Sequence, residues 1–415
     1  MSLARWLCLW LLCLLSAPSA TAQALPVPES PVEVWLATIE PGEVYWQRFG
    51  HNAIILRDRE SGRGISYNFG YFDFAQQDFL LRFVRGRMLY QAVALDADAD
   101  LAGYAEDGRR VWLQRLRLDA AATETLAAYL HGEVQPDRRD YRYDYYTVNC
   151  STRVRDALDL ALGGALKAAT EHRSHGWSYR RYTRAYAQGV PWLYLGTDLA
   201  LGQPVDRVLS LWEEMFIPGE LKRRLRETEI DGQPVVVEER LLPADADPAE
   251  IWPVAPDWRA QFAAAGLILA GLLVALRRLA EAGGWARWPL ALSGAGISLS
   301  LSVAGLLLAG LWLLTDHGSA WRNQNLLLCS PLWLLSLPAW WQLGRQGRVA
   351  GWQARWAAVA GWCALAGVVL AALLKVFRSL DQGNIEWLLL IWPVVLALRY
   401  LLRPPMLTPN AANET

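Results

Sequence analysis

The last third of the chain carries five long apolar segments, which constrain the fold more than any other feature. They lie near residues 260–276, 289–314, 325–343, 355–376 and 385–402. A helix of about 20 apolar residues spans the ~30 Å hydrocarbon core of a bilayer, and each segment is close to that length. Arginines fall at the segment ends, because an arginine at the centre of a spanning helix costs about 2.5–3.5 kcal/mol. We therefore predict an all-α transmembrane domain of about five helices.

The N-terminus reads as a secretory signal peptide. Arg5 gives a basic start, Trp6–Leu15 an apolar core, and Ala22-Gln-Ala24 a small-residue cleavage site. An exported N-terminal domain makes the first membrane span run inward. The loops that are then cytoplasmic carry more arginine than the outer loops, in agreement with the positive-inside rule. The sequence thus predicts a multi-pass membrane protein with an exported soluble domain.

The predicted organisation has five parts. They are a signal peptide (1–24), a soluble domain (25–242), a linker rich in proline and aspartate (243–257), a transmembrane domain (258–402) and a cytoplasmic tail (403–415). The net charge of -1 gives no reason to expect a nucleic-acid partner.

The soluble domain contains a single cysteine, Cys150. A lone cysteine in an oxidising compartment lacks a disulfide partner and is a candidate reactive thiol. Apolar residues after Cys150 follow a helical spacing, so the thiol lies at a helix N-terminus, which favours a thiolate. The helix dipole contributes about 0.3–1 kcal/mol to the stability of a thiolate. This is less than one pKa unit, which corresponds to about 1.36 kcal/mol, so a base must also help to ionise the thiol. The alternative is that Cys150 is a buried small hydrophobe.

His51 is the predicted base. It opens an apolar strand, and a polar loop leads back into a second strand ending at Gly70. In this hairpin His51 pairs near Gly70, so Asn68 projects on the same face and is placed to orient the imidazole. Asp73 is the second candidate for the orienting residue.

Two further histidines are runner-up bases, His172 and His175. Their short spacing, without a cysteine or carboxylate framework, does not predict a metal site. Other patterns predict further elements of an α+β domain. These are strands at Val32–Ile39, Arg110–Leu118 and Val235–Leu242, and helices at Phe74–Val84 and Asp119–Gly132.

An outer loop between the second and third spans is unusually polar. Its candidates for a substrate contact or lid are Asp316, His317, Asn323 and Asn325. The alternative is an ordinary connector, in which Asn323 caps the next helix.

Four motifs carry a family resemblance. They are Phe49-Gly-His51, Tyr67-Asn-Phe-Gly70, Asn149-Cys-Ser-Thr-Arg-Val-Arg-Asp156, and Thr315-Asp-His317 with Asn323-Gln-Asn-Leu-Leu327. Together they resemble the Lnb-type lipoprotein N-acyltransferase family. More distantly, the soluble domain resembles the permuted papain-like group that includes lecithin:retinol acyltransferase and NlpC-type peptidases.

The resemblance implies a bacterial inner-membrane enzyme that acts without a cofactor. Cys150, deprotonated by His51, would take an acyl chain from a phospholipid or diacylglyceryl group. The resulting thioester would pass the chain to the α-amine of a bacterial lipoprotein's N-terminal cysteine. The Cys150 backbone N–H, with Asn149, would hold the oxyanion.

Two other functions remain open from the sequence. The same dyad serves a periplasmic cysteine peptidase or amidase acting on the cell wall, which would need a single anchor rather than five spans. A non-enzymatic membrane sensor or assembly protein would leave the cysteine incidental. An aromatic-lined path from Cys150 to the membrane surface would favour lipid chemistry over both.

Overall fold

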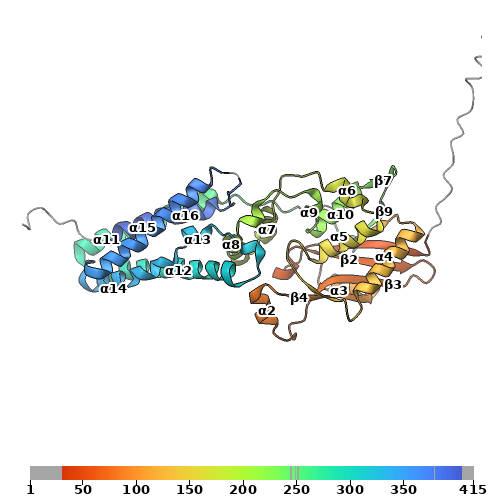
Figure 1. Cartoon of the computed structure of the whole chain (residues 1–415), viewed down its shortest axis with the longest axis horizontal. Helices are drawn as coiled ribbons and strands as arrows, with labels where there is room; N and C mark the ends of the chain where they lie inside the picture. The colour runs from red at the N-terminus through yellow and green to blue at the C-terminus, as the bar shows by residue number, and fades with distance from the viewer. Residues whose placement is uncertain (1–29, 244, 248, 250–251, 378, 404–415) are drawn as a thin grey trace, which may run out of the picture.

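The chain folds into an α/β domain followed by a bundle of long helices (Figure 1). The computed structural model describes residues 30–243, 245–247, 249, 252–377 and 379–403. The predicted layout, a soluble α+β domain before a helical membrane region, is confirmed, whereas the papain-like assignment stays a prediction. The predicted signal peptide and nearly all of the predicted tail lie outside the described residues.

A seven-stranded antiparallel sheet forms the centre of the α/β domain. Its strand order is β6-β4-β3-β2-β1-β5-β9. The strands are β1 (Val32–Ile39), β2 (His51–Asp58), β3 (Gly64–Tyr71), β4 (Leu89–Asp96), β5 (Val111–Leu116), β6 (Asp140–Arg142) and β9 (Val236–Leu242). A separate two-stranded ribbon pairs β7 (Glu229–Ile230) with β8 (Gln233–Pro234).

The β2–β3 hairpin has the register that the sequence predicts. Ala53 lies opposite Asn68, and the same register, continued by two residues, brings His51 level with Gly70. On the other side of β2, His51 pairs with Ile39, the last residue of β1. His51 therefore stands at an end of the sheet, with Asn68 on the same face.

Both faces of the sheet are covered. One face buries Leu36, Ile54 and Phe69 in a cluster to which three helices contribute most of the helical residues. These are α4 (Ala120–Glu133), α5 (Cys150–Ala161) and α10 (Pro218–Glu227). The opposite face buries a smaller cluster around Trp35 and Ile55 beneath α3 (Ala97–Glu106).

One prediction for the soluble domain needs correction, and one helix was not predicted. The helix expected at Phe74–Val84 is shorter, and α2 spans Phe79–Arg85. It starts late because the preceding residues form turns and Asp78 has a φ of 58°, which a helix does not allow. The sequence reading also missed α3, whose aspartate-rich first turn gave no clear apolar period.

Short helices join the sheet to the membrane region. They are η1 (Tyr45–Gln47), α6 (Ala165–Thr170), α7 (Tyr179–Ala187), α8 (Pro191–Ala200), η2 (Gln203–Asp206) and α9 (Leu211–Glu214). Figure 1 shows α7 and α8 between the sheet and the ends of the long helices.

Four helical segments are long and apolar enough to cross a membrane. They are α11 (Arg259–Gly283), α12 (Arg287–Leu314), the composite segment Asn325–Gln346, and α15 (Gly351–Leu374). The composite segment contains α13 (Asn325–Leu328), η4 (Pro331–Ser336) and α14 (Leu337–Gln346), and η3 (Gly318–Ala320) precedes it. The fifth predicted span, α16 (Ile385–Leu401), has 17 residues with Pro393 inside it and is shorter than these four.

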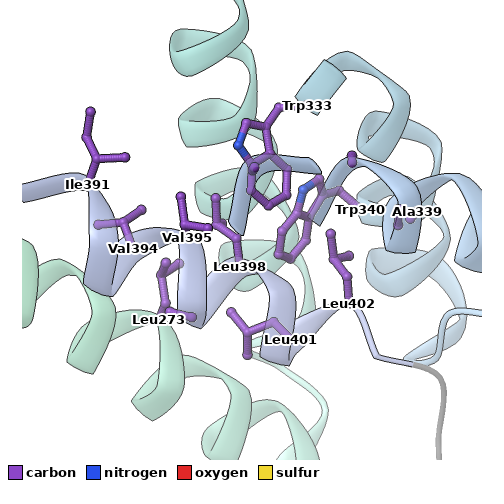
Figure 2. Close-up of a cluster of buried hydrophobic side chains, with 14 of the residues drawn as sticks. Leu273, Trp333, Ala339, Trp340, Ile391, Val394, Val395, Leu398, Leu401 and Leu402 are labelled. Atoms are coloured by element: carbon purple, nitrogen blue, oxygen red, sulfur yellow. The ribbon is translucent and has the colours of Figure 1, made fainter. Parts of the chain in front are cut away.

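The core of the membrane region forms around α16. Figure 2 shows Val395 and Leu398 between Leu273 of α11 and two tryptophans of the composite segment. Trp333 and Trp340 are fully buried, and the indole N–H of Trp340 donates to Ser298 Oγ of α12 at 3.0 Å. The short α16 is therefore a packed part of this bundle rather than a surface helix.

Candidate active site

Cys150 is the first residue of α5, as the sequence predicts, and Asn149 is the N-cap. The Asn149 side chain accepts from the Thr152 N–H, and Thr152 Oγ1 accepts from the Asn149 N–H, forming a capping box. The Asn149 amide donates to the carbonyls of Tyr145 and Phe216. All its donors are thus occupied, which contradicts its predicted role as an oxyanion donor. Its role is to fix where α5 begins.

The Cys150 thiol is hydrogen-bonded to the His51 imidazole. Both residues are half-buried at the end of the sheet. Backbone N–H groups of Asn52 and Ser151 also point at the sulfur. The sulfur therefore lies between a base and two fixed donors, a setting that suits a thiolate.

A chain of hydrogen bonds orients the imidazole on the side away from the thiol. His51 Nε2 donates to Asn68 Oδ1 at 2.8 Å, which leaves Nδ1 for the thiol. Asn68 Nδ2 in turn donates to Asp100 Oδ2 at 2.9 Å and to Ser66 Oγ at 3.0 Å. Because Asp100 is an acceptor, the orientation of the Asn68 amide is fixed, with its oxygen toward His51.

Two glycines make this close arrangement possible. Gly50, before His51, has a φ of +81°, and an added Cβ would lie 2.7 Å from the Ile39 carbonyl oxygen. Gly70 has a φ of +94°, and its Cβ would lie 3.5 Å from Cys150 Cβ. Both conformations are ones that residues other than glycine rarely adopt. The glycines of the Phe-Gly-His and Asn-Phe-Gly motifs thus have a local structural reason.

The two groups of the dyad shift each other's pKa. Burial acts to lower the pKa of His51, but the charge and hydrogen bond of Cys150, with the bond to Asn68, outweigh burial and raise it. Burial likewise acts to raise the pKa of Cys150, but His51 and the Asn52 and Ser151 N–H groups lower it. Both directions favour a thiolate–imidazolium pair.

The alternative site candidates lie elsewhere. Asp73 is exposed, and its carboxylate accepts from the Ala75 N–H, so the structure favours Asn68 over Asp73 as the orienting residue. The exposed His172 lies beside Glu171, and His175 Nδ1 pairs with Glu214 at 2.9 Å.

One cluster in the described residues has the composition of a metal site. Ligand atoms of His175, Glu214 and Glu220 lie within 4.8 Å of one another. Glu220 is already paired with Arg223 and Arg224, at 2.6 and 3.1 Å. These guanidinium groups compensate its charge and would repel a cation, so we assign this cluster no metal role.

The outer-loop residues tie the two parts of the chain together. Asn323 Nδ2 donates to the carbonyls of Leu199 and Ala200 at the end of α8, and Asn325 Nδ2 also donates to Leu199. Both asparagines are buried, at 2% and 0% exposure. Their predicted role in substrate contact is therefore wrong, because their side-chain amides already donate to carbonyls at the contact with α8.

Asp316 and His317 contact the soluble domain at a different place. The Asp316 carboxylate accepts from Arg87 at 2.8 Å and from Arg142 at 2.9 Å. His317 Nε2 lies 3.0 Å from the Phe83 carbonyl oxygen of α2. The loop therefore holds α2 rather than reaching the thiol.

A row of aromatic rings runs from the thiol to α2. The Tyr143 ring borders Gly70 beside Cys150 and stacks on Tyr90 with ring centroids 4.2 Å apart. Tyr90 contacts Phe72 at 5.2 Å, and Phe72 contacts Phe79, the first residue of α2, at 6.4 Å. We call these four residues the aromatic row. It joins the thiol to the side of the domain that faces the membrane helices.

Comparison with known proteins gave a family match in the N-terminal part of the chain. Residues 27–185 match the family model described as the Lnb N-terminal periplasmic domain. The N-terminal part of this chain is therefore similar to that periplasmic domain. Comparisons with curated proteins and with solved structures gave no match. With its apolar helices, the chain is a membrane protein with a periplasmic domain.

The matched segment, residues 27–185, contains every residue of the thiol–imidazole line, including those that the sequence did not predict. Asp100, Ser66 and the Asn52 N–H gave no signal in the sequence. Asp100 lies in the helix that the reading missed, and a backbone donor has no residue signature. Tyr143 lies in a tyrosine-rich stretch, residues 141–146, whose composition alone predicts no role.

Proposed function

We propose that this protein is a thiol-dependent acyltransferase that moves a fatty acyl chain through a Cys150 thioester to the α-amine of a lipoprotein's N-terminal cysteine. The observation that carries this proposal is the line Cys150–His51–Asn68, placed beside an aromatic row that leads toward membrane helices. A nucleophile, a base and an orienting group in hydrogen-bond contact are the elements of covalent acyl catalysis.

In the first step, the Cys150 thiolate attacks an ester carbonyl of a phospholipid or diacylglyceryl donor. The carbonyl oxygen becomes an oxyanion, which the Cys150 backbone N–H at the start of α5 is placed to stabilise. When the ester C–O bond breaks, the His51 imidazolium gives its proton to the departing alkoxide. The products are an acyl-thioester on Cys150, a lyso-lipid and a neutral imidazole.

In the second step, a neutral α-amine attacks the thioester carbonyl. His51 now accepts the proton that the amine nitrogen loses as the amide bond forms. The C–S bond breaks, and the thiolate–imidazolium pair is restored. The cycle therefore consumes one acyl ester and one amine, and returns one lyso-lipid and one amide.

Two features favour lipid chemistry over cell-wall peptide hydrolysis. The side chains beside the thiol are aromatic, since Tyr143 stacks on Tyr90 and Tyr90 contacts Phe72. The domain is also joined to several apolar helices, which place a catalyst next to donors and acceptors that are themselves anchored in a bilayer.

The proposal is tested with purified full-length protein, phospholipid vesicles and a diacylated lipopeptide with a free N-terminus. We expect equal amounts of lyso-phospholipid and N-acylated lipopeptide, and no transfer to a lipopeptide whose amine is already acetylated. Cleavage of a cell-wall stem peptide without acyl transfer would replace the proposal with the peptidase reading. Transfer that survives Cys150→Ala would refute the thioester.

A further inference from the structure

Helix α2 and the turn before it present an apolar surface that no part of the described chain covers. Leu80 is 72% exposed, Leu81 47% and Val84 54%, and Phe74 in the preceding turn is 62% exposed. These side chains line an open hollow of about 580 Å³ together with Phe79, Gln76 and Asp78. Monomeric soluble surfaces rarely gather so many large apolar side chains in one place, and such patches mark protein or membrane contacts.

The position of α2 is fixed against the end of a membrane helix. The Asp316 N–H donates to the Arg85 carbonyl at 2.8 Å, and Gly86 packs directly against the backbone of His317. Asp316 lies two residues after Leu314, the last residue of α12. Figure 1 shows α2 beside this end of α12.

The surface of α12 is also apolar and exposed as far as its last residues, where it meets α2. Leu313 is 74% exposed and Leu314 is 80% exposed. In a helix that spans a bilayer, such residues face lipid. The apolar face of α2 therefore lies close to a lipid-facing surface, at the level where the hydrocarbon ends.

The charges and aromatic residues around α2 also fit a lipid surface. The helix carries Arg82 and Arg85 and no acidic residue after its N-cap Asp78, whereas Arg87, which follows it, is paired with Asp316. Basic residues next to an apolar helix face are attracted to the anionic phosphates of a bilayer. Nearby, Trp192 of α8 is 63% exposed and contacts the exposed Tyr45 ring at 5.8 Å, as in an interfacial aromatic belt.

We propose that the apolar face of α2 is embedded in the periplasmic leaflet of the phospholipid bilayer, where it admits a lipid acyl chain to the aromatic row that ends at Cys150. The argument for the embedding is independent of catalysis, whereas the delivery of an acyl chain rests on the proposed function. The lipid occupies the hollow at Phe74, Leu80 and Val84, and its ester group lies toward Tyr143. The helix is thus an entry point for substrate rather than a passive connector.

The test uses a photo-cross-linking residue, p-benzoylphenylalanine, placed at Leu81 of the full-length protein. The protein is reconstituted in vesicles of phosphatidylethanolamine and phosphatidylglycerol, irradiated, and digested for mass spectrometry. The matched control places the same residue at Leu160, which is 50% exposed on α5. We expect phospholipid to become attached to the cross-linking residue at position 81, and no phospholipid adduct to form at position 160.

Three results would overturn the embedding. They are the absence of a lipid adduct at Leu81, equal lipid adducts at the two positions, and an adduct at Leu81 to a second copy of the chain. The same samples report the mass of the peptide that contains Cys150. A Cys150 acyl adduct without a lipid adduct at Leu81 leaves the proposed function standing and removes this inference. The reverse pattern removes the proposed function and leaves the embedding.

A charge substitution tests delivery separately. Leu81→Glu places a carboxylate where the lipid tail is expected, so acyl-thioester formation from vesicle phospholipid should be largely lost. Leu160→Glu adds the same charge at a comparably exposed site on the same domain and should leave the rate at the wild-type value. Equal rates in Leu81→Glu and wild type, with both proteins folded, would show that α2 does not deliver the substrate.

Discussion

Removing the side chain of Asn68 tests the link between the orienting residue and the base. In Asn68→Ala, His51 Nε2 loses an acceptor at 2.8 Å. A hydrogen bond to a charged group contributes about 1.5–3 kcal/mol and one between neutral groups about 0.5–1.5 kcal/mol. The difference, about 1–1.5 kcal/mol, is the amount by which the hydrogen bond to Asn68 stabilises the imidazolium more than the neutral imidazole. At about 1.36 kcal/mol per factor of ten, acyl-thioester formation should slow by about 5- to 13-fold.

The same reasoning predicts a change in pH dependence. Asn68 helps to raise the pKa of His51, and the imidazolium is the acid that the first step needs. Activity therefore falls as the pH rises through the pKa of His51. Removing Asn68 lowers that pKa, so the upper midpoint of the pH–rate profile should move to lower pH.

The assay is single-turnover acylation of Cys150, followed by intact-protein mass spectrometry across a pH series. Gln114→Ala is the control, because Gln114 is also buried in the sheet and its amide donates to Glu239 and the Lys222 carbonyl, far from His51 along the chain. An unchanged upper midpoint in Asn68→Ala would refute the orienting role. So would an equal loss of rate in Gln114→Ala.

Three further predictions follow from the same contacts. Because His51 lowers the pKa of Cys150, the pH midpoint of alkylation by iodoacetamide should lie below the ordinary thiol pKa of about 8.5. His51→Ala should move this midpoint to higher pH, and an unmoved midpoint would contradict the pairing. Gly86→Ala should lower the melting temperature more than Gly62→Ala. Both glycines have positive φ, but only at Gly86 would the added Cβ meet a backbone, 2.8 Å from His317 N, whereas at Gly62 it would meet nothing within 4 Å. Equal losses would contradict the contact. Asn325→Ala should cost about 1–3 kcal/mol of stability without slowing Cys150 alkylation, and slower alkylation at unchanged stability would contradict its junction role.

The part of the site that sequence could predict follows from local geometry. Side chains alternate between the two faces of a strand, so the position of the β2–β3 loop determines which residue lies opposite His51. It also determines that Asn68 lies on the same face as His51. The start of α5 was equally readable, since Asn149 is a preferred cap and the apolar spacing begins after Cys150. These features depend on residues close together in the chain.

The parts that failed depend on tertiary contacts. Asn323 and Asn325 have the composition of a polar functional loop, but their partners at Leu199 and Ala200 lie more than 120 residues away in sequence. Asn149 is similarly occupied by the carbonyl of Phe216. A polar residue's sequence position does not say which distant carbonyl it will satisfy. Only the folded chain shows that these groups are already paired.

The central claim is that Cys150 carries an acyl chain, and one measurement tests it most directly. Full-length protein in phospholipid vesicles is analysed by intact mass spectrometry, with Cys150→Ala and His51→Ala beside it. Our account predicts a mass gain of one acyl chain on Cys150, removed by hydroxylamine, and absent or strongly reduced in the two variants. An adduct of equal amount in Cys150→Ala, or no adduct from folded wild-type protein, would contradict it.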